Sequence, residues 1–184
     1  KSSYAERIAM SLQGDGRQLY IATLYPYKWN TTEIDPETMQ RIERHRAMRA
    51  DKGFDTVECY RHVEHIVAKR QDVLLLECMS NLLANEMYLE PDSNAGSDMA
   101  ETMSPVSNKI VQALIDLSTR VQDVVIVTND VFSDGGSLTY DESTREYVKN
   151  LAEINCALAQ EAATVTEVVC GIPVIVKKNH PMGK

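Results

Sequence analysis

Short aliphatic runs alternate with longer amphipathic segments along this chain, and this alternation restricts its fold more than any other feature. Six runs rich in Val, Ile and Leu predict β-strands, at 17–23, 55–59, 72–78, 123–129, 166–171 and 173–177. Six segments with helical periodicity predict α-helices, at 2–13, 36–50, 61–69, 79–89, 104–120 and 142–162. Several of the strands are apolar almost throughout, which is typical of strands covered on both faces. This order of elements predicts an α/β fold, with a mostly parallel sheet flanked by helices on both sides.

The last two predicted strands are too close together for a helical crossover, so we expect them to form an antiparallel C-terminal β-hairpin. With 184 residues, 43% of them hydrophobic, the chain can bury one substantial core. We therefore expect a single domain over residues 1–184. The polar segment 90–105 is predicted to be a surface loop.

Charge and cysteine content restrict the function classes. A formal net charge of −8 argues against a nucleic-acid-binding protein, because such proteins present a basic face. The four cysteines have no C-x-x-C spacing, and each lies within or beside an apolar run. We therefore expect reduced, buried thiols rather than disulfides or a zinc site. No apolar stretch approaches the roughly 20 residues of a membrane span. These features lead us to expect a cytoplasmic protein.

In a parallel sheet, ligands bind at the carboxyl ends of the strands. The third predicted strand ends in Glu77, where phosphate-loop enzymes hold a carboxylate that organises Mg²⁺. Lys1 and Ser2 match the last two positions of the phosphate loop G-x-x-x-x-G-K-[ST], in which Lys reaches the terminal phosphates and the hydroxyl holds Mg²⁺. The alternative is an ordinary helix start, with Ser2 or Ser3 as N-cap and Glu6 completing a capping box.

A basic segment, RIERHRAMR, lies on the second predicted helix. Arg41, His45 and Arg49 are spaced i, i+4 and i+8, so they share one helix face, with Arg44 and Arg46 beside them. Arginines in this arrangement can hold phosphate oxygens while a neutral ring nitrogen of the histidine attacks phosphorus. The alternative is a solvated basic face.

Polar residues also follow the strand predicted at 123–129. Thr128, Asn129 and Asp130 stand at its carboxyl end, before a loop that contains glycine. Such residues can line a substrate pocket. They are equally typical of plain turn chemistry.

Several motifs occur in a particular order, from KSSYAERIA and LYIAT through R-I-x-x-H-R, LLLEC and VTNDV to CGIPVIVK. In this order and over essentially the whole chain, the sequence resembles the bifunctional adenosylcobinamide kinase / adenosylcobinamide-phosphate guanylyltransferase family of cobalamin biosynthesis. The resemblance implies a RecA-like P-loop NTPase fold, ATP or GTP as substrates with Mg²⁺, and a homotrimer. It also implies that an N-terminal strand and the glycine-rich part of the phosphate loop are missing in front of Lys1.

Two reactions follow from the resemblance. The enzyme would phosphorylate adenosylcobinamide with a nucleoside triphosphate. It would then attack GTP with a histidine, release pyrophosphate, and pass GMP to adenosylcobinamide phosphate, giving adenosylcobinamide-GDP.

The resemblance also assigns residues. His45 matches the guanylylated histidine, and Lys1 and Ser2 match the end of the phosphate loop. The positions that match nucleotide contacts of the family are Ala22, Thr23, Leu24, Arg46, Ala47, Met48, Arg49, Glu58 and Glu77. Ser2 and Glu77 are the expected Mg²⁺ ligands. Alternatively, Glu58 or Glu77 reads the guanine base, since a carboxylate accepts from both guanine N1–H and the exocyclic amine.

The chain departs from the family pattern at two places. The segment 24–36 is longer than expected, and Asp-Val-Phe-Ser-Asp-Gly-Gly follows Asn129 where Glu-Val-Gly is usual. Two alternatives therefore stay open at this stage. One is a nucleotide-dependent switch without a covalent step, and the other is a monofunctional small-molecule kinase in which the basic helix only clamps phosphate.

Overall fold

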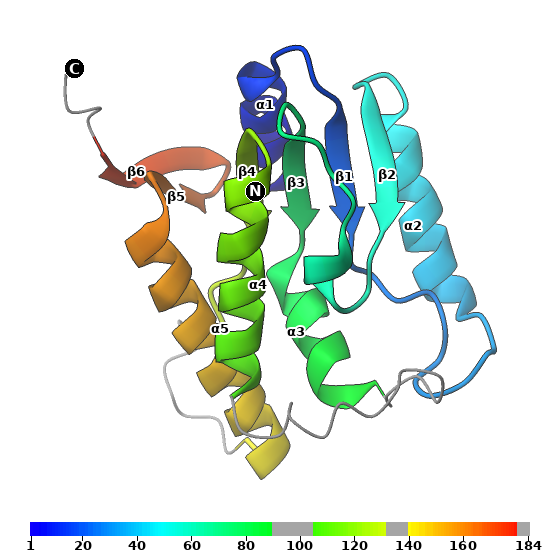
Figure 1. Ribbon diagram of the computed structural model, residues 1–184. Coiled ribbons are helices and arrows are strands. Elements are labelled where there is room, and N and C mark those ends of the chain that lie inside the picture. The colour runs from blue at the N-terminus through cyan, green and yellow to red at the C-terminus, as the bar shows by residue number, and fades with distance from the viewer. Residues whose placement is uncertain (90–104, 132–139, 180–184) are drawn as a thin grey trace.

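The computed structural model describes residues 1–89, 105–131 and 140–179. Its centre is a sheet of four parallel strands in the order β2-β1-β3-β4 (Figure 1). The strands are β1 (Gln18–Ala22), β2 (Phe54–Glu58), β3 (Val73–Glu77) and β4 (Asp123–Val127). Ala22 is paired with both Glu58 and Glu77, and Glu77 with Val127, so all four strands end in line. The predicted α/β fold with a parallel sheet is confirmed.

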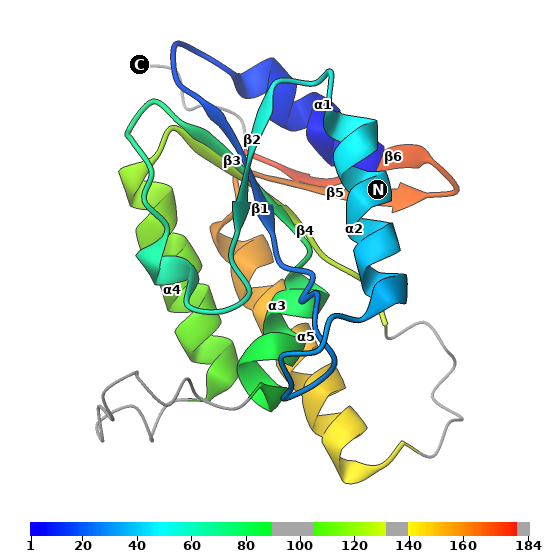
Figure 2. The same cartoon turned by 90° about the vertical axis from the view of Figure 1, so that its right-hand side faces the viewer.

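Helices cover both faces of this sheet, as predicted (Figure 2). One face carries α1 (Ser2–Leu12) and α2 (Pro36–Arg49), and the other carries α3 (Met79–Tyr88), α4 (Val106–Arg120) and α5 (Glu142–Glu161). Successive side chains of a strand point to opposite faces, so each inner strand contributes to two cores. Leu19, Ile21, Leu74 and Leu76 pack against α3, α4 and α5, whereas Tyr20, Val73 and Leu75 pack with α1.

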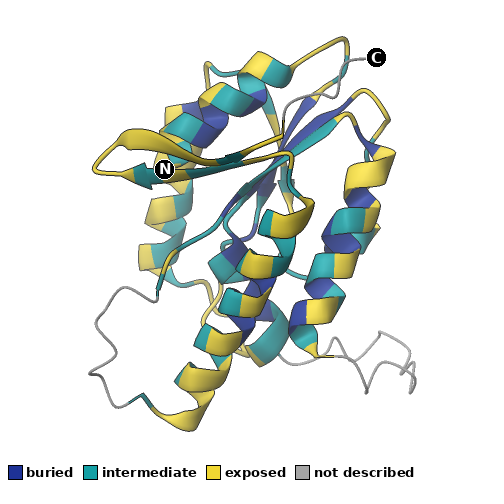
Figure 3. Cartoon of the chain, turned by 90° about the vertical axis from the view of Figure 1, so that its left-hand side faces the viewer, coloured by how far each residue is buried: buried dark blue, intermediate teal, exposed yellow. Residues whose placement is uncertain are grey.

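The predicted C-terminal hairpin is also confirmed. β5 (Thr164–Val169) and β6 (Ile172–Lys178) pair antiparallel in a sheet of their own, directly after α5. Figure 3 shows much of this hairpin coloured as exposed. Its exposed apolar residues are Val169, Ile172, Val174, Ile175 and Val176.

The helix predicted at 61–69 is wrong. Only a single 3₁₀ turn, η1 (Val63–His65), forms there, after His62 in the left-handed region (φ 56°). Val63 and Ile66 are buried against the core three residues apart, a spacing that one 3₁₀ turn satisfies without a longer helix. β-Branched residues also stiffen at χ1 in a helix, which lowers their preference for it.

Three other expectations concern single features. All four cysteines lie within the described ranges and carry free thiols, but the expected burial is wrong: Cys59 and Cys78 are only partly buried, and Cys156 on α5 and Cys170 in the turn between β5 and β6 are exposed. None of the described helices is long and apolar enough to cross a membrane. The predicted loop at 90–105 lies outside the described residues, apart from Pro105, the N-cap residue of α4.

A buried carboxylate ties the starts of β1 and β3 together, at the edge opposite the expected site. The Asp72 side chain is 1% exposed and accepts hydrogen bonds from the Arg17 guanidinium at 2.6 Å, the Arg17 N–H at 3.0 Å and the Lys69 N–H at 2.8 Å. Burial raises the pKa of Asp72, but these donated hydrogen bonds outweigh it and lower the pKa from 3.8 to about 2. The ionised carboxylate therefore stabilises the folded state.

We expect the free energy of unfolding to fall as the pH drops from about 4 towards 2. The folded-state pKa of Asp72 is depressed, so its contribution is present above the unfolded value of 3.8 and is lost as the pH passes through about 2. Its loss costs about 2 kcal/mol, partly reduced by solvent around the half-exposed Arg17. Urea unfolding of Asp72→Asn between pH 2 and 7 measures this. The exposed Asp55→Asn is the control, and an unchanged pH profile in Asp72→Asn contradicts the assignment.

Candidate active site

Five residues singled out in the sequence come together at the carboxyl ends of β3 and β4. Lys1 Nζ donates to Asn129 Oδ1 at 2.6 Å and to the Thr128 carbonyl oxygen at 3.3 Å. The Ser2 hydroxyl donates to the Glu77 carboxylate. Residues far apart in the sequence thus form one polar cluster, which we call the Lys1 cluster: Lys1, Ser2, Glu77, Thr128 and Asn129.

The start of α1 aims at this cluster. Its N-cap is Lys1, no side chain caps it, and its first turn contains no acidic residue. The alternative of an N-cap at Ser2 or Ser3 with a capping box is wrong, because Glu6 is buried and instead accepts a hydrogen bond from Lys52 Nζ at 2.5 Å. The free N–H groups and positive dipole end of a helix N-terminus attract anions such as phosphate.

The connections that follow β1 and β3 are bound to each other. Thr23 is fully buried, and its hydroxyl donates to the Cys78 carbonyl at 2.9 Å and accepts from the Cys78 N–H at 2.8 Å. Asn85 Nδ2 donates to the carbonyls of Thr23 and Tyr60 at 2.8 and 2.9 Å. Because these groups bond to one another, they hold the edge of the sheet in a defined shape around Glu77.

The basic helix α2 places its residues in different surroundings. Arg46 forms an ion pair with Glu58 at the end of β2, and Tyr60 Oη donates to the same carboxylate at 2.9 Å. The His45 ring is exposed and makes no hydrogen bond within the described part of the chain. Ala47 and Met48 are exposed as well.

Arg49 lies on the inward side of α2 instead. It is 6% exposed, and its guanidinium carbon lies 3.5 Å from the centroid of the Tyr20 ring. Its Nε has no hydrogen-bond partner among the described residues. Arg49 therefore packs against the sheet and does not share the open face of His45.

The oxygen atoms of the Lys1 cluster suit Mg²⁺ if water and substrate phosphates complete its coordination. They do not form a complete metal site made of protein atoms alone. No group of three or more His, Cys, Asp or Glu side chains gathers into a metal site within the described ranges. Mg²⁺ is commonly bound by one or two protein oxygens, with water and substrate phosphates filling the other positions. The Ser2 hydroxyl beside the Glu77 carboxylate provides that kind of partial site.

Comparison with known protein families shows to which family the chain belongs. A profile of the cobinamide kinase / cobinamide phosphate guanyltransferase family (CobU) matches residues 1–176. The chain belongs to this family. It is therefore an enzyme, a kinase and guanylyltransferase whose substrates are nucleoside triphosphate and cobinamide. A comparison with curated proteins found no significant match.

The family confirms the resemblance seen in the sequence, and it favours the bifunctional enzyme over the switch and the simple kinase. Sequence reasoning correctly placed the basic segment RIERHRAMR on a helix, α2. It noted the segment 24–36 only as longer than expected.

Tyr20 is a site residue that the sequence analysis missed. It lies within β1 and is 3% exposed. Burial raises its pKa, and the neighbouring Glu77 carboxylate raises the pKa further. Glu77 thus accepts a hydrogen bond from the Ser2 hydroxyl and also acts electrostatically on the buried Tyr20. A tyrosine within an aliphatic strand carries no sequence signal for this role.

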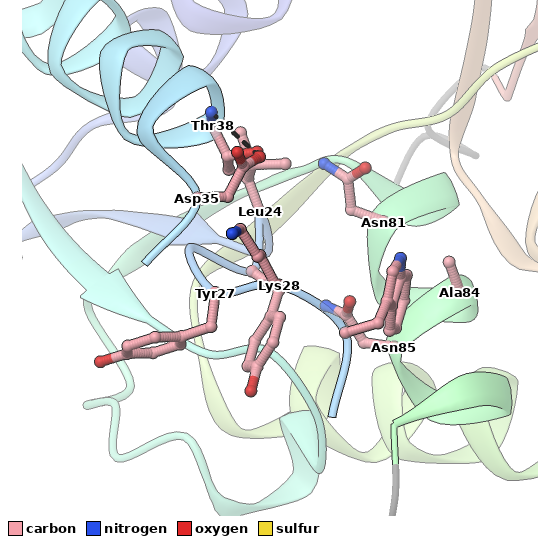
Figure 4. A pocket seen from close by; sticks show the side chains of 10 residues that line it. Leu24, Tyr27, Lys28, Asp35, Thr38, Asn81, Ala84 and Asn85 are labelled. Carbon is pink, nitrogen blue, oxygen red and sulfur yellow. Dashed lines mark hydrogen bonds between the residues drawn. The ribbon is translucent and has the colours of Figure 1, made fainter. Parts of the chain in front are cut away.

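A pocket of about 330 Å³ opens beside the Lys1 cluster, and it too was not predicted. Figure 4 shows Asn81, Ala84 and Asn85 on α3, across from Leu24 and Lys28 on the segment that follows β1. Leu24, a predicted nucleotide contact, lines this pocket. The signal that could have located the pocket is the aromatic content of LYPYKW, directly after a strand end.

Proposed function

We propose that this CobU member phosphorylates adenosylcobinamide with ATP or GTP and then transfers GMP from GTP, through His45, to adenosylcobinamide phosphate. One observation carries the proposal. Lys1 and Ser2, at the N-terminus of α1, lie against Glu77 and Asn129 at the carboxyl edge of a parallel sheet. A cation, a helix N-terminus and hard oxygen ligands at one point match what a triphosphate with Mg²⁺ needs.

In the kinase step, the Lys1 ammonium and the N–H groups of α1 would hold the terminal phosphates. Ser2 and Glu77 would hold Mg²⁺, which would supply charge neutralisation for the phosphate groups. The substrate hydroxyl attacks the γ-phosphorus, its proton is lost, and the bond to the nucleoside diphosphate breaks. Because little covalent chemistry falls to the protein, positioning and charge stabilisation would supply most of the rate. That a glycine-rich segment belongs in front of Lys1 stays a prediction.

In the guanylyl step, a ring nitrogen of His45 would attack the α-phosphorus of GTP. A nitrogen–phosphorus bond forms and pyrophosphate leaves. An oxygen of the cobinamide phosphate then attacks the same phosphorus and frees the histidine. The exposed imidazole supports this role, since a large phosphorylated substrate can reach it. Arg46 and Glu58, which pair beside it, are the proposed nucleotide contacts on α2 and β2.

The test is to assay the two half-reactions separately on the full-length protein. With ATP, Mg²⁺ and cobinamide we expect phosphorylated cobinamide. With GTP and Mg²⁺ alone we expect the intact mass of the protein to rise by one GMP unit. Phosphorylation without the mass increase would support a simple kinase, and GTP binding without either product would support a switch.

Glu77→Gln distinguishes the two roles open to this carboxylate. We propose the metal role, because the Ser2 hydroxyl shares the same carboxylate. The variant should then need roughly tenfold more Mg²⁺ for half-maximal phosphorylation, with its preference for GTP over ITP unchanged. Glu58→Gln, at the end of β2 with β1 between it and β3, is the contrasting variant, because Glu58 is a proposed nucleotide contact and the Mg²⁺ dependence should stay unchanged. Loss of base preference at unchanged Mg²⁺ dependence would assign Glu77 to guanine instead.

We also propose that the protein self-associates, as a trimer by family resemblance, and works in the cytoplasm. The exposed apolar side chains of the β5–β6 hairpin support association, because a free monomer seldom leaves such a ribbon uncovered. Four free thiols support a reducing compartment. The molecular mass of the protein in solution tests self-association, and a monomer would contradict it. Cell fractionation tests the cytoplasmic location.

A further inference from the structure

Aromatic side chains from three separate segments form a continuous wall beyond the carboxyl edge of the sheet. We call this the aromatic wall: Tyr25, Tyr27, Trp29, Tyr60 and Tyr88. Tyr25 stacks on Trp29 with ring centroids 6.3 Å apart, and it meets Tyr27 and Tyr60 at 5.4 Å. Tyr88 on α3 meets Trp29 edge to face at 6.4 Å. These rings follow β1, β2 and β3 in sequence, so the parallel topology brings them together.

The indole of Trp29 separates two hollows. On one side is the pocket of about 330 Å³ lined by Leu24, Tyr25 and Asn81, and on the other an open hollow of about 560 Å³ lined by Tyr88 and Tyr147. Trp29 and Ala84 line both. Trp29 is 52% exposed although it is a large aromatic residue. A ligand that covered both hollows would bury this indole.

Carboxamide groups supply polar atoms at the floor of the first pocket. Asn85 uses its amide N–H groups to bind two backbone carbonyls, which leaves its Oδ1 as an acceptor at the pocket wall. Asn81, one turn earlier on α3, points into the same pocket (Figure 4). The charged residues there are already engaged, because Lys28 pairs with Glu33 at 2.6 Å and Asp35 caps α2. The pocket therefore favours a neutral ligand with amide groups.

The hollows adjoin the Lys1 cluster through direct contacts. Tyr147 Oη, which lines the open hollow, donates to the Ser80 carbonyl at 3.1 Å. The Ser80 hydroxyl accepts from Asn129 Nδ2 at 2.8 Å, and Asn129 accepts from Lys1. A ligand on the aromatic wall thus lies next to the groups proposed to hold the triphosphate.

We propose that the aromatic wall and its two hollows bind the corrin ring of cobinamide. This rests on the proposed function and names the substrate subsite of the same active site. A corrin is a broad, flat, apolar macrocycle fringed with neutral carboxamides, which matches stacked rings, two adjoining hollows and a floor of asparagine amides. The side arm of the bound ring would point towards Lys1, where its hydroxyl receives phosphate.

A nucleobase is the rival occupant of this surface. A purine is also flat and stacks on aromatic rings. However, one purine would cover only one side of Trp29 and leave the other hollow open. The extent of the wall therefore favours the larger ring, and the experiment separates the two.

The single tryptophan of the chain reports on this site directly. We expect dicyanocobinamide to quench Trp29 fluorescence saturably, because the corrin absorbs in the range of indole emission, whereas GTP and ATP should leave it unchanged. Quenching by nucleotide and not by cobinamide would overturn the proposal in favour of a base-binding wall.

Two variants test the wall without relying on fluorescence alone. Trp29→Ala should raise the KM for cobinamide at least about tenfold, with the GMP adduct on the protein unchanged. Ala84→Glu places a charge between the hollows on a helix that tolerates glutamate, so it should abolish cobinamide binding in equilibrium dialysis. Ile34→Ala is the control, since Ile34 lies on the same segment and is also 52% exposed.

Unchanged cobinamide KM and binding in both variants would reject the aromatic wall as the subsite. A wild-type protein that turns over no cobinamide would instead reject the proposed function. Circular dichroism would reveal whether Trp29→Ala folds. If it does not fold, Ala84→Glu alone tests whether the aromatic wall binds cobinamide, because this variant keeps the aromatic wall intact.

Discussion

Replacing His45 by alanine abolishes the covalent GMP adduct that the wild-type protein is expected to form with GTP and Mg²⁺. Alanine has no nucleophilic nitrogen, so no phosphorus–nitrogen bond can form. The exposed position of His45 on α2 means that the substitution removes no buried contact, and we expect folding to be unaffected. Intact-mass spectrometry before and after mild acid treatment measures the effect, since a phosphoramidate is labile in acid.

His65→Ala is the matched control for this experiment. His65 is also exposed but lies in η1, on the other face of the sheet, and its loss should leave the adduct intact. An adduct that persists in His45→Ala would move the covalent step to another residue. Transfer of GMP to cobinamide phosphate should disappear together with the adduct, because both depend on the same nitrogen.

Replacing Lys1 by alanine in the full-length protein lowers the kcat of cobinamide phosphorylation by about 10²–10³-fold. The Lys1 ammonium lies beside the N-terminus of α1 and next to Asn129, where it would neutralise charge that develops on the transferred phosphoryl group. Lys149→Ala is the control, because Lys149 is exposed on α5 and, among the described residues, its ion pair is with Glu153. Phosphorylation within a few-fold of the wild type would exclude Lys1 from the phosphate site.

The local pattern of the sequence was sufficient to predict most of the helices and strands and the residues at which they end. Strands β3 and β4 are aliphatic runs bounded by polar residues, and α2 begins with Asp35 as N-cap and Pro36 in its first turn. Because parallel strands end at one edge, Glu77 at the end of β3 and Thr128 just after β4 lie at the same edge of the sheet. The error at 61–69 arose where apolar spacing fits both a helix and a single turn.

The sequence could not predict contacts between residues that are distant along the chain. The basic helix appeared to carry Arg49 on the same face as His45, but the Tyr20 ring offers a site under the helix and draws Arg49 inward. The aromatic wall is a second example. Its members lie on the segments that follow three strands, with Tyr88 at the end of α3, and only their common edge makes them neighbours.

The sequence by itself therefore determined the alternation of strands and helices, the parallel sheet and the acidic and lysine-serine motifs at its carboxyl edge, since each of these depends on local periodicity and spacing. Only the tertiary structure decided which side chains remain open to substrate. That choice depends on packing between elements, where burial of one arginine on a tyrosine or exposure of one tryptophan between two hollows is set by neighbours far away in sequence.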